Sequence, residues 1–443
     1  MPLFGTNGIR GVLNEDLMAD LGYKFGMAVG THYQDRDIAL AYDNRTTSRL
    51  LKNLAEAGLL NSGKNAIDLG MIPTPAIQVY CKLNEIPGIM ITASHNPPNF
   101  NGFKVIAKDG TNPGKAEEAK IEELILSEKF KNAKWNTVGL SRADDAITPY
   151  LREIIKNVDQ ERIRKRQFRV LVDCANSTTL VTTPRLLSKL GVEYVSVNAN
   201  EDAFFPGREP EPTAENIKEL ISFAKSVRFD FSVAHDGDGD RAVFINELGE
   251  MIDGDKFVAL VADHILEKKK GDIVFPVASS FLVDRIAEKH GVNVIRTPVG
   301  APIISETLTK TKGVMGGEEN GKVILPHYLN GGDGGLSVAL ALDIVASRGK
   351  EISSLIKELP DYKLRRIKIS NKYDFESIKT KIRDFYPRMT PDEMDGLRLV
   401  DKDSFILLRK SGTEQAIRVY ISSMNSEWIE IREREIMKLI GPN

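Results

Sequence analysis

Short apolar runs alternate with stretches of helical periodicity along most of the chain. Residues 38–42 form an apolar run that ends at Asp43, and a stripe of leucines predicts a helix over residues 48–61. Further strands are predicted at residues 66–69 and 88–91. Because these strands are apolar throughout and are separated by helices, they indicate βαβ units in sheets that are covered on both faces.

The same alternation starts again twice further along the chain, which indicates related units although no repeat is visible residue by residue. The second set comprises a strand at residues 169–173, a helix at residues 183–190, and strands at residues 229–233 and 242–245. The third set begins with strands at residues 273–275 and 292–295.

From about residue 368 the pattern changes to short strands in a segment rich in aspartate and lysine. Strands are predicted at residues 397–400, 405–408 and 417–421, and a final helix begins near residue 427. This combination is typical of a smaller α+β domain. We therefore predict four domains, at residues 1–150, 151–255, 256–365 and 366–443.

Composition narrows the class of protein. The chain has 443 residues, too many for a single core, and its 42% hydrophobic and 28% charged residues are typical of globular proteins. A net charge of -2 gives no support for nucleic-acid binding, and no apolar stretch is long enough to span a membrane. The N-terminus lacks the features of a signal peptide and the two cysteines have no metal-type spacing, so we expect a cytoplasmic location.

Three aspartates, Asp236, Asp238 and Asp240, alternate with glycines after an apolar strand. Glycine permits the tight backbone that brings such carboxylates to one point, and without a cation the carboxylates would repel one another. Three hard oxygen ligands suit Mg²⁺. A calcium EF-hand would use Glu247 as its last ligand, but Arg241 stands where that loop needs glycine and the flanks predict strands, so this alternative is disfavoured.

Ser94 lies in the polar turn Thr92–Pro98, which follows the apolar run at residues 88–91. Adjacent residues of an extended strand point to opposite faces, so we do not expect Ser94 to pair with His95 as in a hydrolase, and the G-x-S-x-G motif is absent. A phosphorylated Ser94 is the better interpretation, because its oxygens would complete the cation site of the three aspartates. In isolation, Ser94 would be an ordinary turn or helix-capping serine.

Charged residues near these two loops complete the predicted catalytic set. A lysine ten residues beyond Ser94, Lys104, suits charge neutralisation or proton transfer, and Arg10 in the glycine-rich segment Phe4–Gly11 suits charge stabilisation. Taken alone, each also fits a solvated surface side chain. The predicted catalytic residues are Ser94, Lys104, Arg10, His95 and Arg241, and the predicted metal ligands are Ser94, Asp236, Asp238 and Asp240.

Two later loops offer groups for binding a sugar phosphate, although each alone also fits a surface turn. Residues 316–321 place acceptors for sugar hydroxyls between glycines, and residues 409–414 offer an arginine, two hydroxyls and backbone amides for a non-reacting phosphate. The predicted substrate-binding residues are Glu318, Asn320, Lys322, Arg409, Ser411, Gly412, Thr413 and Arg418.

In this combination and order, the motifs resemble those of the α-D-phosphohexomutases, and the likeness covers nearly the whole chain. The segments that carry it are Phe4–Gly11, Thr92–Pro97, Asp236–Arg241, Gly317–Gly321 and Arg409–Glu414. The resemblance implies a fold of three related α/β domains with mixed sheets and a smaller C-terminal α+β domain around a central cleft. It also implies that Ser94 is the phosphoserine and that the three aspartates bind Mg²⁺ with it.

The mechanism that the resemblance implies is an exchange of phosphoryl groups. Phospho-Ser94 gives its phosphoryl group to a sugar monophosphate, a hexose 1,6-bisphosphate forms and reorients, and its other phosphoryl group returns to Ser94. The implied cofactors are Mg²⁺ and the bisphosphate, and the implied partner is a sugar phosphate. A monomer and a homodimer both fit the sequence.

Two departures from the family pattern affect the choice of sugar. Lys322 stands where bacterial phosphomannomutase relatives often carry histidine, and Gln415 stands where proline is common. The loop Glu318–Gly321 resembles that of archaeal phosphoglucosamine mutases and broad phosphomannomutase/phosphoglucomutases, between which the sugar stays open. Two alternatives are a Mg²⁺-dependent sugar-phosphate phosphatase that uses the same acidic loop, and a calcium- or sugar-phosphate-binding protein, which leaves the Ser94 turn unexplained.

Overall fold

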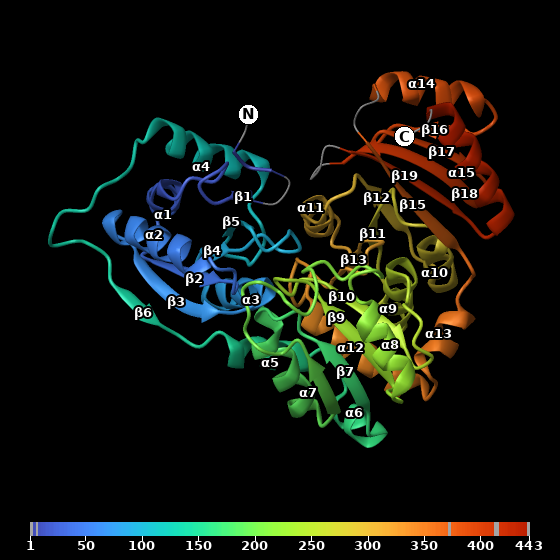
Figure 1. Ribbon diagram of the computed structural model, residues 1–443, viewed down its shortest axis with the longest axis horizontal. Helices are drawn as coiled ribbons and strands as arrows, with labels where there is room; N and C mark the ends of the chain where they lie inside the picture. The colour runs from blue at the N-terminus through green and yellow to red at the C-terminus, as the bar shows by residue number, and fades with distance from the viewer. Residues whose placement is uncertain (1–2, 6–7, 371–373, 412–415, 441–443) are drawn as a thin grey trace. The chain divides into compact units, whose positions relative to one another are not determined.

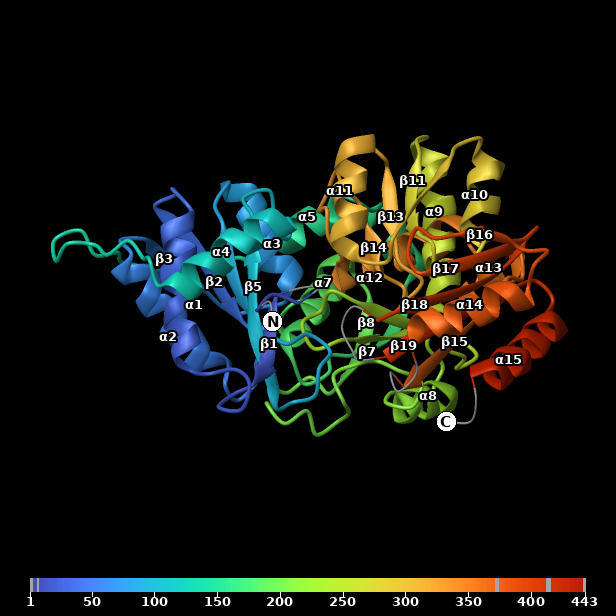
Figure 2. The same cartoon turned by 90° about the horizontal axis from the view of Figure 1, so that it is seen from above.

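The computed structural model describes residues 3–5, 8–370, 374–411 and 416–440 (Figure 1 and Figure 2). It divides into two compact units, each of which contains two sheets. The first unit comprises residues 1–252 and 327–353, and the second comprises residues 253–326 and 354–443.

The first sheet of the first unit is mixed and has the strand order β1-β5-β4-β2-β3-β6. Parallel pairs join β2 to β4 and to β3, and β3 to β6, whereas β5 runs antiparallel to β4 and β1. The helices α2 (Ser48–Asn61) and α3 (Thr74–Asn84) make the crossovers between the parallel strands. The strands are β1 (Ile9–Val12), β2 (Asp37–Tyr42), β3 (Asn65–Met71), β4 (Gly88–Ile91), β5 (Phe100–Ile106) and β6 (Ser141–Ala143).

Helices cover both faces of this sheet, which explains why its central strands are apolar throughout. Ile38 and Leu40 of β2 belong to a buried core with α1 (Asp20–His32), α2 and α4 (Lys115–Ser127). Ala39, between them, faces the other way. Its side chain lies on the same side of Gly88 in β4 as the side chains of Ile77 and Cys81 of α3. Alternate residues of one strand therefore enter two different apolar layers.

The second sheet has the order β10-β9-β7-β8, with β7 parallel to β8 and β9 and with β10 antiparallel to β9. The strand predicted at residues 229–233 begins two residues later, because its pairing with β7 starts at Phe231. A helix from further along the chain, α12 (Gly334–Arg348), packs against this domain. The remaining elements are β7 (Arg169–Asp173), β8 (Glu193–Val197), β9 (Phe231–His235), β10 (Ala242–Asn246), α5 (Ile147–Ile155), α6 (Gln160–Arg166), η1 (Thr178–Val181), α7 (Thr183–Leu190) and α8 (Lys218–Ser226).

The second unit contains a third mixed sheet, of order β12-β11-β13-β14. The strand β11 is parallel to β12 and β13, and β14 is antiparallel to β13. Its elements are β11 (Ile273–Pro276), β12 (Val294–Thr297), β13 (Met315–Gly317), β14 (Val323–Ile324), α9 (Gly254–Lys268), α10 (Leu282–His290) and α11 (Ala301–Thr311), and α13 (Ile352–Glu358) follows α12 along the chain.

The fourth sheet, of order β15-β19-β18-β17-β16, is antiparallel throughout. Alternation along β18 separates its two faces: Ile406 and Leu408 pack with α14 (Phe375–Phe385) and α15 (Ser426–Ile440), whereas Phe405 and Leu407 pack with Val277. Its strands are β15 (Lys363–Ser370), β16 (Thr390–Asp392), β17 (Leu397–Asp401), β18 (Ser404–Lys410) and β19 (Ala416–Ser423). The predicted fold class, three α/β domains with mixed sheets followed by an α+β domain, is confirmed.

Candidate active site

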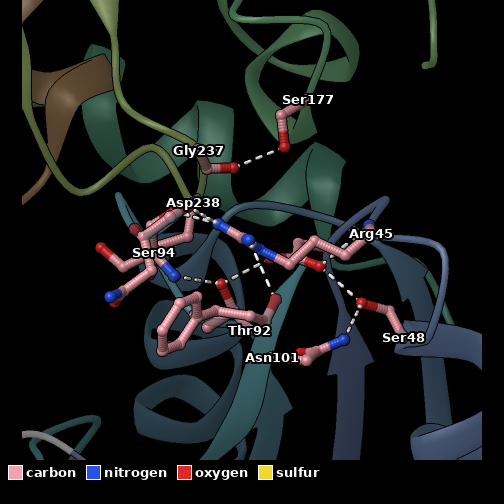
Figure 3. A network of polar contacts seen from close by, with 12 residues as sticks. Arg45, Ser48, Thr92, Ser94, Asn101, Ser177, Gly237 and Asp238 are labelled. Atoms are coloured by element: carbon pink, nitrogen blue, oxygen red, sulfur yellow. Dashed lines mark hydrogen bonds and ion pairs between the residues drawn. The ribbon is translucent and has the colours of Figure 1, made fainter. Parts of the chain in front are cut away.

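Ser94 sits in a buried turn directly after β4, at the carboxyl end of the strand (Figure 3). Its φ of 54° lies in the left-handed region, which side chains with a β-carbon seldom adopt. The backbone N–H of Ser94 donates to Thr92 Oγ1 at 2.9 Å. The turn thus holds the Ser94 hydroxyl in one orientation at the edge of the sheet.

The expected separation of Ser94 and His95 is wrong. Ser94 Oγ lies 3.4 Å from His95 Nδ1, because Ser94 is in a left-handed turn and not in an extended strand. The same ring nitrogen lies 3.1 Å from Arg241 Nη2, which can only donate. Arg241 therefore occupies the lone pair that a serine hydrolase would use to take the serine proton.

The acidic loop connects β9 to β10 and brings its three carboxylates together. Asp236, Asp238 and Asp240 are all buried, and one oxygen from each lies within 4.8 Å of the others. Ser94 Oγ donates to Asp236 Oδ2 at 3.2 Å, so the two predicted loops meet. Asp236 also accepts a hydrogen bond from the backbone N–H of Arg241 at 3.1 Å.

Asp238 has two further partners in the first domain. Lys104 of β5 is buried, not solvated, and its Nζ lies 2.6 Å from Asp238 Oδ2, which also accepts from Thr74 Oγ1 at 2.6 Å. Burial alone would raise the pKa of Asp238, but the Lys104 ammonium and these hydrogen bonds hold it well below its usual range. The carboxylate is therefore charged.

The residues of the acidic loop fit a divalent cation. Asp238 Oδ1 is buried and has no hydrogen-bond partner within the described part of the chain. A buried carboxylate oxygen without a donor is costly, and coordination of a cation would satisfy it. Hard carboxylate oxygens close together, beside the Ser94 hydroxyl, are the ligand type that Mg²⁺ prefers.

The serine turn and the acidic loop approach so closely that only glycine fits at Gly237. A β-carbon there would lie 2.5 Å from the carbonyl oxygen of Ser94. A further hydrogen bond joins the loop to its surroundings from Ser177 Oγ to the Gly237 carbonyl at 2.5 Å (Figure 3). Another runs from the Thr74 N–H to the Asp238 carbonyl at 2.9 Å.

Arg10 lies on β1 and not in a terminal tail. It donates from Nη1 to the Ala93 carbonyl at 3.2 Å and to Asn96 Oδ1 at 2.7 Å, so it holds both sides of Ser94. Burial lowers the pKa of Arg10, as does the nearby Arg241, while the carboxylates of the acidic loop oppose the change. All five predicted catalytic residues thus come from two neighbouring domains of the first unit.

In the second unit, the predicted sugar loop is a tight connection between β13 and β14. Glu318 and Lys322 are buried and joined through their backbones at 3.0 Å, and Asn320 is exposed with its Oδ1 accepting from the Lys322 N–H. Glu319 is also buried, which raises its pKa to about 7 although Arg366 opposes the change. The loop therefore contains two buried acids and one buried lysine.

The predicted phosphate loop follows β18 in the same unit. Arg409 Nε donates to Asp395 Oδ2 at 2.8 Å, and the Arg409 backbone pairs across the sheet with Arg418 of β19. The backbone N–H of Ser411 donates to the Ala416 carbonyl at 2.8 Å. The other two predicted residues of this loop, Gly412 and Thr413, lie outside the described residues.

Several residues that support the site were not singled out from the sequence. Thr74, at the start of α3, contacts Asp238 through both its hydroxyl and its N–H. In the sequence, a threonine at this position indicates only the start of a helix. Arg45 lies beneath the Ser94 turn, three residues after the end of the strand that the pattern did predict. Lys104, by contrast, was predicted, and its position between Phe103 and Val105 in a mostly apolar strand is consistent with a buried charge.

No helix in the described ranges is both long enough and apolar enough to cross a membrane. Three family models match consecutive parts of the chain: phosphoglucomutase/phosphomannomutase alpha/beta/alpha domain I over residues 1–132, domain II over residues 148–249, and domain III over residues 253–362. The predicted domain limits stay predictions.

Similar proteins match over nearly the full length. A phosphoglucomutase/phosphomannomutase of Thermococcus kodakarensis is 42% identical, covering 99% of this chain and 97% of the relative. A phosphoglucosamine/phosphogalactosamine mutase of Sulfurisphaera tokodaii is 35% identical, with 99% of each chain covered. The crystal structure of a phosphoglucomutase/phosphomannomutase family protein from Burkholderia thailandensis has a TM-score of 0.88 at 25% identity, covering 100% of this chain and 98% of that one.

Proposed function

Because the chain belongs to the α-D-phosphohexomutase family, we propose that it interconverts hexose 1-phosphates and hexose 6-phosphates through a phosphorylated Ser94. Membership makes the protein an enzyme, an isomerase that acts by phosphoryl transfer. The route through Ser94 and a bisphosphorylated sugar is our proposal for this chain.

One observation carries the proposal: the Ser94 hydroxyl lies 3.2 Å from Asp236 within a cluster of three buried carboxylates. A hydroxyl beside a cation-binding cluster suits phosphoryl transfer, because the charge on the transferring group needs a counter-charge at that point. We propose that Asp236, Asp238, Asp240 and phosphorylated Ser94 hold Mg²⁺. When bound, Mg²⁺ neutralises charge on the phosphoryl oxygens and polarises the phosphorus.

The chain's own residues orient the reacting groups. Lys104 fixes the carboxylate of Asp238 and adds a buried positive charge to the site. Arg10 holds the Ser94 turn from the side of β1. His95 accepts from Arg241 and is thereby held beside Ser94 without serving as its base.

In the proposed first step, a free hydroxyl oxygen of the sugar monophosphate attacks the phosphorus of phospho-Ser94. The bond from phosphorus to Ser94 Oγ breaks and its electron pair stays on Oγ, which gains one proton as the sugar hydroxyl loses one, so Ser94 is left as a hydroxyl. The hexose 1,6-bisphosphate then presents its other phosphoryl group, and the reverse transfer restores phospho-Ser94. Positioning and charge stabilisation supply most of the rate in such a transfer.

We further propose that the loop of Glu318, Asn320 and Lys322 binds the sugar hydroxyls, and that Arg409, Ser411, Gly412, Thr413 and Arg418 bind the phosphate that is not reacting. Similarity to relatives with two names, phosphoglucomutase/phosphomannomutase and phosphoglucosamine/phosphogalactosamine mutase, supports two substrate ranges. We propose a phosphoglucosamine mutase or a phosphomannomutase/phosphoglucomutase of broad specificity.

Phosphorus NMR of the purified protein tests this function directly. The protein is incubated with Mg²⁺, a trace of glucose 1,6-bisphosphate, and the 1-phosphates of glucose, mannose and glucosamine in turn. We expect the 6-phosphate signal to grow at the expense of the 1-phosphate. Accumulation of inorganic phosphate without interconversion would instead support the Mg²⁺-dependent phosphatase.

Two serine variants then test the carrier. Ser94→Ala should lower turnover by several orders of magnitude and abolish the mass increase of the protein after incubation with the bisphosphate. Ser62→Ala is the matched control, because Ser62 is also buried but its hydroxyl donates to the Leu59 carbonyl at the end of α2, away from the Ser94 turn. Near-wild-type turnover of Ser94→Ala would remove Ser94 from the mechanism.

A further inference from the structure

Arg45 is completely buried beneath the Ser94 turn, and it uses every N–H of its guanidinium group (Figure 3). A guanidinium has five N–H donors in a rigid planar arrangement. One donates to Asp43 Oδ2 at 3.0 Å. The other four reach backbone carbonyls of one short segment: Ser94 at 2.8 Å, Asn96 at 2.7 Å, Pro97 at 2.5 Å and Phe100 at 2.9 Å.

The guanidinium cannot act on a substrate itself. Its charge is paired with Asp43, whose side chain is equally buried, and the ring of Phe205 covers it at 5.3 Å. No N–H is left over for a phosphoryl oxygen, because all five have acceptors. Whatever Arg45 contributes must therefore pass through the backbone of the Ser94 turn.

The same ion pair holds both backbone groups of Ser94. On one side, Arg45 binds the Ser94 carbonyl. On the other side, Asp43 accepts from Thr92 Oγ1 at 2.7 Å, and Thr92 Oγ1 in turn accepts from the Ser94 N–H at 2.9 Å. Asp43 is itself fixed by Ser48 Oγ at 2.5 Å. A continuous set of buried hydrogen bonds thus encloses the peptide units on both sides of Ser94.

Ser94 needs such support because its backbone is strained. At a φ of 54°, a residue with a β-carbon is less stable than in the right-handed conformation. Without the enclosing hydrogen bonds, the turn would relax, and Ser94 Oγ would move away from Asp236 Oδ2, which now lies 3.2 Å away.

A second buried pair repeats this arrangement under the acidic loop. Asp173 ends β7, and Arg208 Nε donates to its Oδ2 at 2.8 Å. A further N–H of Arg208 donates to the carbonyl of His235, the residue immediately before Asp236. In both domains an aspartate at the end of a central strand thus pairs with an arginine, which binds the backbone of the Ser94 turn in one domain and the residue next to the acidic loop in the other.

We propose that Arg45 is a positioning residue for phosphoryl transfer: through its five hydrogen bonds it keeps Ser94 in the left-handed conformation that directs Oγ to the acidic loop. The proposal rests on the role of Ser94 as phosphoryl carrier. Arg45 contacts neither substrate nor metal, and it acts by fixing the distance and direction of the Ser94 hydroxyl.

Arg45→Lys tests the proposal, because lysine keeps the charge but replaces five fixed donors by three on one atom. We expect kcat to fall by about 10²-fold with KM changed little, since a displacement of about 1 Å at the reacting group has an effect of that size. The rate at which Ser94 gains mass from hexose 1,6-bisphosphate should fall by the same factor. Hydrogen exchange of the peptide that contains the Ser94 N–H should become faster.

The matched control is Arg296→Lys. Arg296 also pairs with a carboxylate, that of Asp284, and also donates to backbone carbonyls, those of Pro276, Ser279 and Ser280, but it lies in the second unit. Its kcat should stay within about twofold of wild type, because none of its hydrogen-bond partners belongs to the Ser94 turn or to the acidic loop. Melting curves establish that each variant is folded at the assay temperature.

Three outcomes with the two arginine variants would overturn the proposal. They are an Arg45→Lys enzyme with wild-type kcat, an equal loss of kcat in Arg296→Lys, and a loss of kcat without faster exchange at Ser94. If Arg45→Lys does not fold, Thr92→Val is used, because it removes only the link between Ser94 and Asp43. It should show a smaller loss of kcat and a smaller increase in hydrogen exchange at Ser94. Unchanged kcat in Thr92→Val also overturns the proposal. A wild-type protein without mutase activity would refute the proposed function instead, and the exchange experiment would still show whether Arg45 fixes the turn.

Discussion

Replacing Gly237 by alanine tests how closely the acidic loop and the serine turn must approach. The added β-carbon would lie 2.5 Å from the Ser94 carbonyl oxygen and 3.3 Å from the β-carbon of Pro210. Unbonded heavy atoms pack at about 3.5 Å, so the loop and the turn must separate by roughly 1 Å. The backbone of Gly237 lies outside the left-handed region, so this contact, and not a forbidden conformation, causes the effect.

The expected losses in activity and in stability differ in size. Overpacking of a buried site costs about 1–3 kcal/mol of unfolding free energy. A separation of about 1 Å would break the hydrogen bond between Ser94 Oγ and Asp236, now 3.2 Å long, and a misplacement of that size lowers rates by about 10²-fold. The Gly237→Ala enzyme should therefore be folded and yet nearly inactive.

Steady-state kinetics with glucose 1-phosphate and urea unfolding measure the two losses separately. Gly114→Ala is the matched control, because Gly114 precedes α4 with a φ of -69° and a β-carbon there would meet nothing within 4 Å. We expect it to match wild type in both measurements. A Gly237→Ala enzyme with wild-type kcat would show that the contact between the loops does not determine activity.

Three further substitutions probe charge. Lys104→Met leaves the buried carboxylate of Asp238 without its ammonium partner, so the free energy of unfolding, measured with urea in EDTA, should fall by about 3–5 kcal/mol. Mg²⁺ should restore part of this loss, and equal losses with EDTA and with Mg²⁺ would contradict the prediction. Asp236→Asn should abolish most of the stabilisation that Mg²⁺ gives the wild type in calorimetry, about 2.7 kcal/mol at a hundredfold excess over Kd. Burial raises the pKa of Glu319 from 4.5 to about 7, so the folded protein prefers the protonated form of this side chain. The free energy of unfolding should therefore fall by on the order of 3 kcal/mol as the pH rises from 4.5 to 7. This fall should disappear in Glu319→Gln, and an unchanged pH profile in that variant would refute the raised pKa of Glu319.

The elements of the fold could be predicted because their signals are local. The predicted strand at residues 38–42 and helix at residues 48–61 coincide with β2 and α2 to within one residue. A period of 2 or 3.6 is set by the backbone itself, so a short window contains it. The domain packing is not local: α12 follows the third sheet along the chain yet packs on the second domain, which no periodicity indicates.

Residues of the site could be predicted where they belong to a short sequence motif with a recognisable spacing. Ser94 and the three aspartates stand out by their spacing, whereas Thr74 and Arg45 do not, because what matters for them is which distant backbone they meet. The separation of Ser94 from His95 was predicted wrongly for a related reason: a positive φ at a non-glycine residue has no marker in the sequence.

The two aspartate–arginine pairs show where the precision of the site originates. Each aspartate lies at the carboxyl end of β2 or β7. Arg45 binds the loop after the neighbouring strand β4, and Arg208 binds His235, the last residue of the neighbouring strand β9. Each loop is thus fixed within its own sheet before any ligand binds, which is the preorganisation that transition-state stabilisation requires. The placement of one loop against the other depends on a different set of contacts: the hydrogen bonds from Ser94 to Asp236 and from Arg241 to His95, and the close approach at Gly237. One methyl group at Gly237 should for this reason affect the reaction more than the loss of any surface ion pair, whose median contribution is below about 1 kcal/mol.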